Sequence, residues 1–405
     1  LGFSPLAASG LSLIANTAPV AYGALGTPVI TLAKVHGYDL AEVSAMIGRQ
    51  LPFFSLLVPF WLIWAFAGWR GMKQIWPAIL VTGVSFAIPQ FLVSNYMGPE
   101  LVDVIAAICS MAALVLFLKV WKPAEIWTSV SLKGHETDGG QSGEAKAPVK
   151  HDSATVVKAW TPWVILTVFV FAWGLPATKN YLNGIFSPKF AIEGLHKLIE
   201  KVPPVVPKPT AEAAEYVFNL LSATGSGILL SAVIGGLVMG YSIPALVRAY
   251  GKTIVLVRYS LLTIVLMLAL GTLTRYSGLD TTLGLAFAAT GAFYPFFGTL
   301  MGWLGVALTG SDTASNVLFG GMQKVAAEQL GLSANLMGAA NSSGGVMGKM
   351  IDAQSIVVAS TATRWFDHEG DILRYVFFHS IALACLVGIL VTLQAYVPPF
   401  THMVI

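Results

Sequence analysis

The sequence predicts an all-α polytopic membrane protein. Of its 405 residues, 56% are hydrophobic and only 11% are charged, whereas charged residues make up about 25% of a typical soluble domain. The mean hydropathy is +0.73, and apolar windows recur along the whole chain, most of them at the roughly 17–25 residues that a spanning helix needs. Helices are expected at this depth because they satisfy their backbone hydrogen bonds internally.

The apolar windows indicate about nine spanning helices. The window 279–308 is long enough to hold one span and the start of another segment, and 345–362 is unusually polar for a helix that faces lipid. In chain order the windows cover residues 44–68, 75–93, 101–121, 160–177, 216–241, 253–273, 279–308, 345–362 and 373–396.

Two polar stretches interrupt the apolar pattern. Residues 122–158 are rich in Gly, Ser, Lys and acidic side chains. This composition cannot bury a core, so we expect a flexible aqueous loop. Residues 179–215 contain FAIEGLHKLIEK, with apolar residues at helical spacing, followed by VPPVVPKPT. We expect an amphipathic helix on the membrane surface and a stiff proline-rich connector.

Several classes of function lack support in the sequence. The net charge is only +3 without a basic cluster, so nucleic acid is not an expected partner. No GxxxxGK[ST], HExxH or Cys/His metal spacing occurs, which predicts neither an enzyme nor a metal or cofactor site. Cys109 and Cys385 lie inside apolar windows, where we interpret them as buried small hydrophobic residues. A membrane hydrolase built from Ser, Lys and Asp stays open as an alternative.

The two ends of the chain resemble each other. SLIANTAPVAYGALGTP and MIGRQLPFFS occur near the start, and ALTGSDTASNVLFGGM and MIDAQSIVVAS occur near the end. Alternation of the spans gives the two copies opposite directions, which favours an inverted repeat over chance similarity between segments rich in small residues. The matches, 296 and 304 residues apart, pair Thr17-Ala18 with Thr313-Ala314, and Met46-Ile47 and Gln50 with Met350-Ile351 and Gln354.

Residues 10–33 and 305–330 are too short and too rich in Gly, Pro, Ser, Thr and Asn to be ordinary spans. Irregular backbone at membrane depth survives only around a cavity or packed protein. We therefore expect two re-entrant hairpins whose tips meet. A half-helix that begins at such a tip favours an anion through its free N–H groups and its dipole. Asn16-Thr17 and Ser311-Asp312-Thr313 stand at positions typical of N-caps, and ordinary capping is the alternative explanation.

The stretch 341–354, NSSGGVMGKMIDAQ, places polar and charged residues beside an apolar run. We expect residues 341–345 to form an unwound start of a span. Lys349 and Asp352 are spaced i, i+3 and can pair. An ionisable pair inside a membrane is a functional hypothesis by default. Lys349 would offer positive charge to a carboxylate, and Asp312 or Asp352 would carry a proton. An ion pair that only locks two helices is the alternative.

The motifs SLIANTAPVAYGALGTP, GSDTASNVLFGGMQ and AANSSGGVMGKMIDAQSI resemble those of the L-lactate permease family over essentially the whole chain. These are bacterial inner-membrane transporters that carry lactate and glycolate with protons. Members of the family carry further spans before the first motif, so the resemblance implies that N-terminal spans are missing here. The family is similar to a wider ion transporter superfamily, whose paired hairpins form a transport core on a scaffold that allows a homodimer.

This resemblance divides the chain into functional segments. The expected segments are a first-repeat hairpin and core helix (1–68), scaffold helices (69–121), the polar loop (122–158), further scaffold helices (159–304), a second-repeat hairpin and core helix (305–362) and a C-terminal span (363–405).

The predicted function is proton-coupled uptake of L-lactate, glycolate and D-lactate across the bacterial inner membrane, without a cofactor. The expected partners are the anion, protons and the lipid bilayer. The alternatives are a sister carrier for organic anions with sodium coupling, and an anion channel. The expected substrate-binding residues are Asn16, Thr17, Gln50, Ser311, Thr313, Ser315, Asn316, Asn341, Ser342, Ser343, Lys349 and Gln354, and the expected proton carriers are Asp312 and Asp352.

Overall fold

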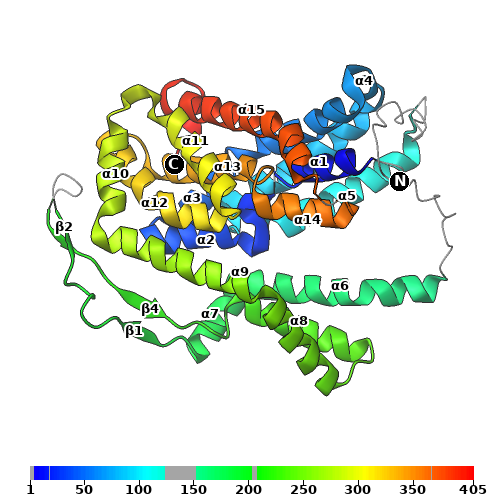
Figure 1. The fold of residues 1–405 in the computed structure, drawn as a ribbon, viewed down its shortest axis with the longest axis horizontal. Coiled ribbons are helices and arrows are strands. Elements are labelled where there is room, and N and C mark those ends of the chain that lie inside the picture. The colour runs from blue at the N-terminus through cyan, green and yellow to red at the C-terminus, as the bar shows by residue number, and fades with distance from the viewer. Residues whose placement is uncertain (1–3, 18, 124–151, 203–207, 366) are drawn as a thin grey trace. The chain divides into compact units, whose positions relative to one another are not determined.

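The computed structural model describes residues 4–17, 19–123, 152–202, 208–365 and 367–405. Two compact units form from these residues. The first unit is discontinuous and comprises Leu1–Pro148 and Leu279–Ile405, and the second comprises Val149–Gly278. Most of the polar loop expected at 122–158 lies outside the described residues. Helices dominate both units (Figure 1), which confirms the predicted all-α class.

The first unit combines both ends of the chain. Its N-terminal helices are α1 (Pro5–Ala15), η1 (Val20–Tyr22), α2 (Gly23–His36), α3 (Leu40–Ile47), α4 (Leu51–Tyr96) and α5 (Val102–Val120). Its C-terminal helices are α10 (Leu279–Ala288), η3 (Gly291–Phe293), α11 (Tyr294–Thr309), α12 (Asp312–Gln329), α13 (Ala334–Gly348), α14 (Ala353–Thr363), α15 (Glu369–Tyr396) and η4 (Phe400–Met403).

The second unit contains helices and two short antiparallel strand pairs. Its helices are α6 (Ser153–Gly174), α7 (Pro176–Ile185), α8 (Thr224–Val238) and α9 (Ile243–Ser277). Strand β1 (Lys189–Ala191) pairs with β4 (Glu215–Val217), and β2 (Glu200–Lys201) pairs with β3 (Thr210–Ala211).

The prediction of an amphipathic helix within 190–201 is wrong. The segment consists of strand and turns, and Gly194 and Lys197 have positive φ angles of 76° and 59°. Beside its local turn bonds, the segment makes backbone bonds to a stretch about 20 residues later: the N–H of Ile192 donates to the carbonyl of Ala214 at 2.9 Å. Apolar spacing alone cannot reveal such non-local pairing. Part of the proline-rich connector, 203–207, lies outside the described residues.

Five helical segments within the described residues are long and apolar enough to cross a membrane, or six if one bent pair of helices counts as a span. The windows 44–68 and 75–93 fall in one continuous segment that has non-helical backbone at Gly68 and Ile75. The window 345–362 is split between α13 and α14. The chain is therefore a multi-pass membrane protein, and the number of nine spans stays a prediction.

The two expected hairpins differ in form. Helix α1 and the η1–α2 segment meet at a bend of 65°, and Ala18 within this bend lies outside the described residues. Helices α11 and α12 instead pack against each other on either side of a short turn. That these segments re-enter the membrane stays a prediction.

Elements from the two ends of the chain lie side by side in the first unit. Helix α2 packs on α12, and α3 packs on α13. Figure 1 shows α13 between α12 and α15. Helices α11 and α13 approach so closely that a Cβ on Gly302, Gly344 or Gly348 would collide with the backbone of Asn341, Thr299 or Trp303. Small residues allow such close contact between membrane helices. This packing buries most of the side chains of α12 and α13.

Candidate functional site

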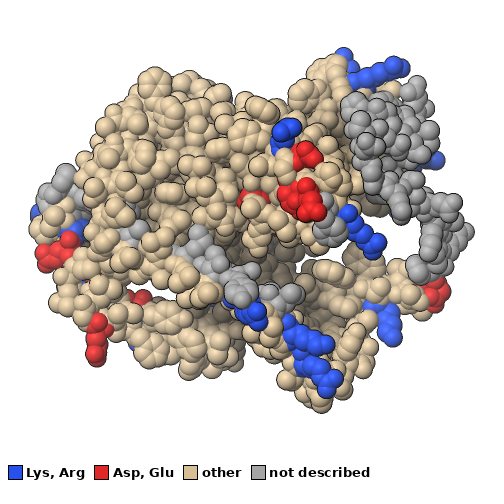
Figure 2. All heavy atoms as spheres, in the orientation of Figure 1, with Lys and Arg blue, Asp and Glu red and all other residues tan. Residues whose placement is uncertain are grey.

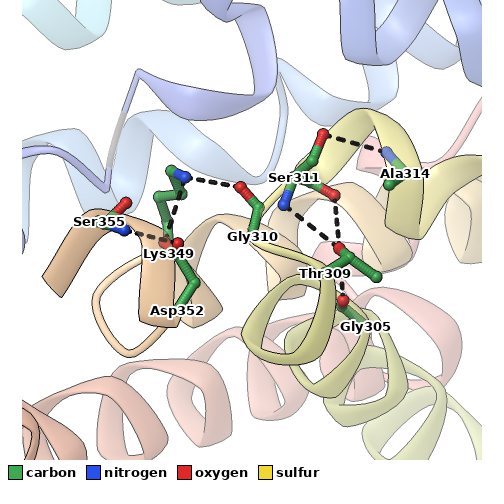
Figure 3. A network of polar contacts seen from close by, with 8 residues as sticks. All are labelled: Gly305, Thr309, Gly310, Ser311, Ala314, Lys349, Asp352 and Ser355. Atoms are coloured by element: carbon green, nitrogen blue, oxygen red, sulfur yellow. Dashed lines mark hydrogen bonds and ion pairs between the residues drawn. The ribbon is translucent and has the colours of Figure 1, made fainter. Parts of the chain in front are cut away.

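The turn between α11 and α12 places a carboxyl group inside the protein. Gly310 ends α11 with a left-handed φ of 72°, a conformation that glycine adopts without steric cost. Ser311 caps α12, since its Oγ accepts a hydrogen bond from the N–H of Ala314 at 3.3 Å. Figure 3 shows this turn. Asp312 follows as the first residue of α12, and only 3% of it is exposed.

A second irregular segment lies between α13 and α14. Asp352 caps α14, because its Oδ1 accepts from the N–H of Ser355 at 2.8 Å. Lys349 Nζ lies 3.1 Å from Asp352 Oδ2, which confirms the predicted pairing. The same Nζ donates to the carbonyl of Gly310 at 2.6 Å. Lys349 thus joins the α13–α14 break to the turn that precedes Asp312, as Figure 3 shows.

The unwound segment lies later in the chain than the sequence predicted. Residues 341–345 are regular helix within α13, so the expected unwound start there is wrong. The backbone leaves the helix only at 349–352. The side chains of Asn341 and Ser342 bond to residues of α12. Because they find partners across the helix interface, they do not compete for the backbone of their own helix.

A continuous chain of buried hydrogen bonds starts at Asp312. Ser342 Oγ donates to Asp312 Oδ2 at 2.5 Å. Asn316 Nδ2 donates to Ser342 Oγ at 3.3 Å, and Asn341 Nδ2 donates to Asn316 Oδ1 at 2.9 Å. All four residues are at most 3% exposed. Hydrogen bonds in a buried interior are strengthened by the low local dielectric, and an unpaired member is costly.

The chain continues into α11. Gln323 Nε2 donates to Asn341 Oδ1 at 3.2 Å and to the carbonyl of Gly298 at 2.7 Å. The hydroxyl of Tyr294 donates to Gln323 Oε1 at 2.8 Å. We define the polar chain as Asp312, Ser342, Asn316, Asn341, Gln323 and Tyr294. Its last two members were missed: Gln323 ends the motif GSDTASNVLFGGMQ but was not chosen as a site residue, and Tyr294 lies in the apolar window 279–308.

Three buried atoms at this site lack a hydrogen-bond partner among the described residues: Asp312 Oδ1, Ser343 Oγ and Asp352 Oδ2, of which the last is ion-paired with Lys349. Asp312 Oδ1 lies against Gly345, where an added Cβ would approach it to 2.5 Å. A buried acceptor without a donor costs about 1–3 kcal/mol. Such an oxygen is suited to receive a proton, or a donor group of a bound molecule.

The remaining predicted residues of the second half lie around the same turn. Ser315 is fully buried, and its Oγ donates to the carbonyl of Gly302 at 3.2 Å. Thr313 is half-buried, whereas Gln354 is exposed. Gln354 still lies close to the tip, since its Oε1 would be 3.4 Å from a Cβ on Gly310. Ser315 therefore belongs to the packed interior, and Gln354 to its edge.

The predicted residues of the first half have other neighbours. Gln50 is buried, but its Nε2 donates to Gln394 of α15 at 3.2 Å. Thr17 is buried and donates to the carbonyl of Ile14 at 2.8 Å, while Asn16 is exposed. The hydrogen bonds of Thr17 and Gln50 therefore lie outside the polar chain. The first half reaches it through α2, because Asn316 Nδ2 also donates to the carbonyl of Pro28 at 3.3 Å.

Few of the described charged side chains lie inside the protein, and three of them lie close together at this site. Figure 2 shows a surface that is mostly tan, with Lys, Arg, Asp and Glu in small scattered groups. Lys349, Asp352 and Asp312 lie instead at or near the turn, with 19% of the Lys349 side chain exposed. Across the described ranges no group of three or more His, Cys, Asp or Glu side chains is placed to hold a metal ion. The arrangement provides one half-buried cation and two buried carboxyl groups.

Comparison with known proteins gives one family. A family model described as L-lactate permease matches residues 1–398. The glycolate permease GlcA of Escherichia coli K12 is 44% identical over all of this chain and 73% of its own length. The L-lactate permeases of Salmonella typhimurium and Bacillus subtilis are 43% and 41% identical, each over 98% of this chain and over 72% and 73% of their own lengths. No solved structure matches.

Proposed function

Because this chain belongs to the L-lactate permease family, we propose that it is a secondary active transporter that imports L-lactate together with protons. Its substrates would extend to related small 2-hydroxy monocarboxylates such as glycolate and D-lactate, and its location would be the bacterial inner membrane. The permeases of this family are transporters and not enzymes. The observation that carries the proposal is the buried carboxyl group of Asp312 at the start of α12, with one oxygen lacking a partner.

Asp312 is the proposed proton carrier. A buried charged carboxylate is costly unless partners compensate it, and among the described residues the only hydrogen bond to this side chain comes from Ser342. Uptake of a proton on Oδ1 removes the charge, and loss of the proton restores it. Buried acidic residues in transporters commonly serve as proton relays. Asp352 is less suited to this role, because Lys349 neutralises it and its Oδ1 caps α14.

The turn beside Asp312 supports an anion site. Lys349 Nζ supplies a positive charge, and the first turn of α12 supplies N–H groups and the positive end of the helix dipole. We expect the substrate carboxylate here, near Ser311 and Thr313, and the 2-hydroxyl at Asn316. Asn316 and Asp312 are buried, so a substrate reaches them only when α12 shifts relative to α13. Alternating exposure of such a site is the general mechanism of secondary transporters.

The test is uptake of radiolabelled L-lactate into proteoliposomes, with an inward proton gradient and no sodium. Accumulation above the external concentration that a protonophore abolishes is the expected result. Uptake that requires a sodium gradient would support a sodium-coupled carrier instead. Flux that only equilibrates, with or without the protonophore, would support an anion channel and contradict coupling through Asp312.

A further inference from the structure

Two contacts from α2 converge on Asn316. The carbonyl of Pro28 accepts a hydrogen bond from Asn316 Nδ2 at 3.3 Å. His36 Nε2 lies 3.1 Å from the backbone carbonyl of Asn316 and 2.9 Å from that of Val317. Carbonyl oxygens only accept hydrogen bonds, so Nε2 carries a proton in this arrangement. Helix α2 thus holds both the side chain and the backbone of a single residue of α12.

His36 has little freedom to move in this position. It is 5% exposed. A Cβ on Gly320 would lie 2.6 Å from His36 Cδ2 and 2.5 Å from Leu32 Cδ1. The ring therefore fits against a bare stretch of α12, one turn after Asn316. Glycine at position 320 makes this approach possible, since any larger residue would displace the ring.

Tyr38 makes a comparable contact farther along the same helix pair. Its hydroxyl donates to the carbonyl of Gly320 at 2.8 Å, and Lys324 Nζ donates to the carbonyl of Gly37 at 3.0 Å. These bonds join Gly37 and Tyr38, directly after the end of α2, to α12, but they do not reach Asn316. Tyr38 therefore offers a matched control for the contact that His36 makes.

Among the described residues, the Asn316 side chain leaves one hydrogen-bonding position unused. Its two amide hydrogens go to Pro28 and Ser342, and its Oδ1 accepts from Asn341. An amide oxygen has two lone pairs, so Oδ1 can accept one further hydrogen bond. The hydroxyl of a 2-hydroxy acid is a donor of that kind. The orientation of Oδ1 then decides whether a substrate with the hydroxyl is preferred over one without it.

We propose that His36 is a positioning residue: by holding the α12 turn that bears Asn316, it aligns Asn316 Oδ1 with the substrate 2-hydroxyl and so sets the preference for 2-hydroxy acids. This inference rests on the proposed function. The first repeat then contributes to specificity through the hydrogen bonds that α2 makes with Asn316, and not through Asn16 or Thr17 at its own bend. A hydrogen bond to a substrate group is a strong source of discrimination, because an analogue without that group leaves a buried partner unpaired.

The experiment compares L-lactate with propionate, which lacks the 2-hydroxyl, in proteoliposomes containing the whole chain. For each variant we would measure the KM and Vmax for L-lactate and the inhibition constant of propionate. His36→Phe removes the donor but keeps a ring, His36→Gln restores a donor, and Tyr38→Phe removes the matched bond. Gly320→Ala displaces the imidazole without replacing it. Size-exclusion profiles in detergent would confirm that each variant folds.

His36→Phe should raise the KM for L-lactate about five- to tenfold, the scale of one hydrogen bond, and change the propionate constant less than about twofold. Gly320→Ala should act in the same direction. His36→Gln should recover most of the preference, and Tyr38→Phe should keep it. Equal shifts in His36→Phe and Tyr38→Phe, or equal shifts for both ligands, would overturn the inference. A wild-type protein that does not prefer L-lactate to propionate would overturn both the inference and the proposed substrate.

Discussion

Replacement of Asp312 by asparagine tests the proposed coupling most directly. The asparagine side chain has nearly the same shape, so its Oδ1 can keep the hydrogen bond from Ser342, which Asp312 accepts at 2.5 Å. Its Nδ2 then takes the place of the oxygen that has no partner and lies against Gly345. The variant therefore cannot exchange a proton at this position, while the surrounding packing is retained.

The magnitude follows from these contacts. One amide group would be left buried without an acceptor, which costs about 1–3 kcal/mol. Against this, the wild-type carboxyl also leaves an oxygen unpaired, so we expect the net loss of folding stability to lie near the lower end, about 1 kcal/mol. The loss of concentrative uptake should be complete, because the amide of asparagine does not take up and release a proton as a carboxyl group does.

The assay separates coupling from binding. Asp312→Asn should still exchange internal unlabelled L-lactate for external labelled L-lactate, because exchange needs no net proton movement. It should not accumulate L-lactate under an inward proton gradient. The matched control is Asp352→Asn. Asparagine is also a good N-cap, so the residue at 352 can still accept the hydrogen bond from the N–H of Ser355 while its charge is lost. Protonophore-sensitive accumulation by Asp312→Asn at the wild-type level would refute the assignment, and failure of Asp352→Asn alone would transfer it to Asp352.

Three further changes test the geometry. Lys349→Met leaves Asp352 without its partner at 3.1 Å and should lower the free energy of unfolding by roughly 2–4 kcal/mol. Thermal unfolding in detergent should show that adding Asp352→Asn restores part of the lost stability. No recovery in the double variant would mean that the two side chains are not coupled. Gly344→Ala places a Cβ against the Thr299 carbonyl and should lower the free energy of unfolding by about 1–3 kcal/mol. Its control is Gly370→Ala, which has open space around the new Cβ and should leave stability unchanged. Similar melting temperatures for the two variants would contradict the close α11–α13 packing. Gln50→Leu removes the bond to Gln394 and should leave the KM for L-lactate within about twofold of the wild-type value, since an interaction outside the substrate contacts affects binding little. A KM raised about tenfold would place Gln50 at the substrate site.

Local sequence was sufficient where neighbouring residues decide the structure. Hydrophobic content and window length predicted a helical membrane protein, because the bilayer imposes both. Ser311-Asp312-Thr313 predicted the capped start of a helix, and Lys349 and Asp352 predicted an i, i+3 pair; the structure confirms both features. Both features depend on contacts between residues only a few positions apart, and a short motif contains all of these residues.

The partners of the polar residues depended on tertiary structure. Asp312 and Ser342 are 30 residues apart in the chain, and His36 and Asn316 are 280 apart. No local pattern encodes such pairs. Gln50 and Gln354 match in sequence, yet Gln50 bonds to α15 while Gln354 lies beside Gly310. The segment 190–201 has helical spacing but forms strand and turn, because its backbone pairs with residues far along the chain. The sequence by itself thus determined which groups must avoid lipid, whereas the packing of α2, α12 and α13 decided which of them meet.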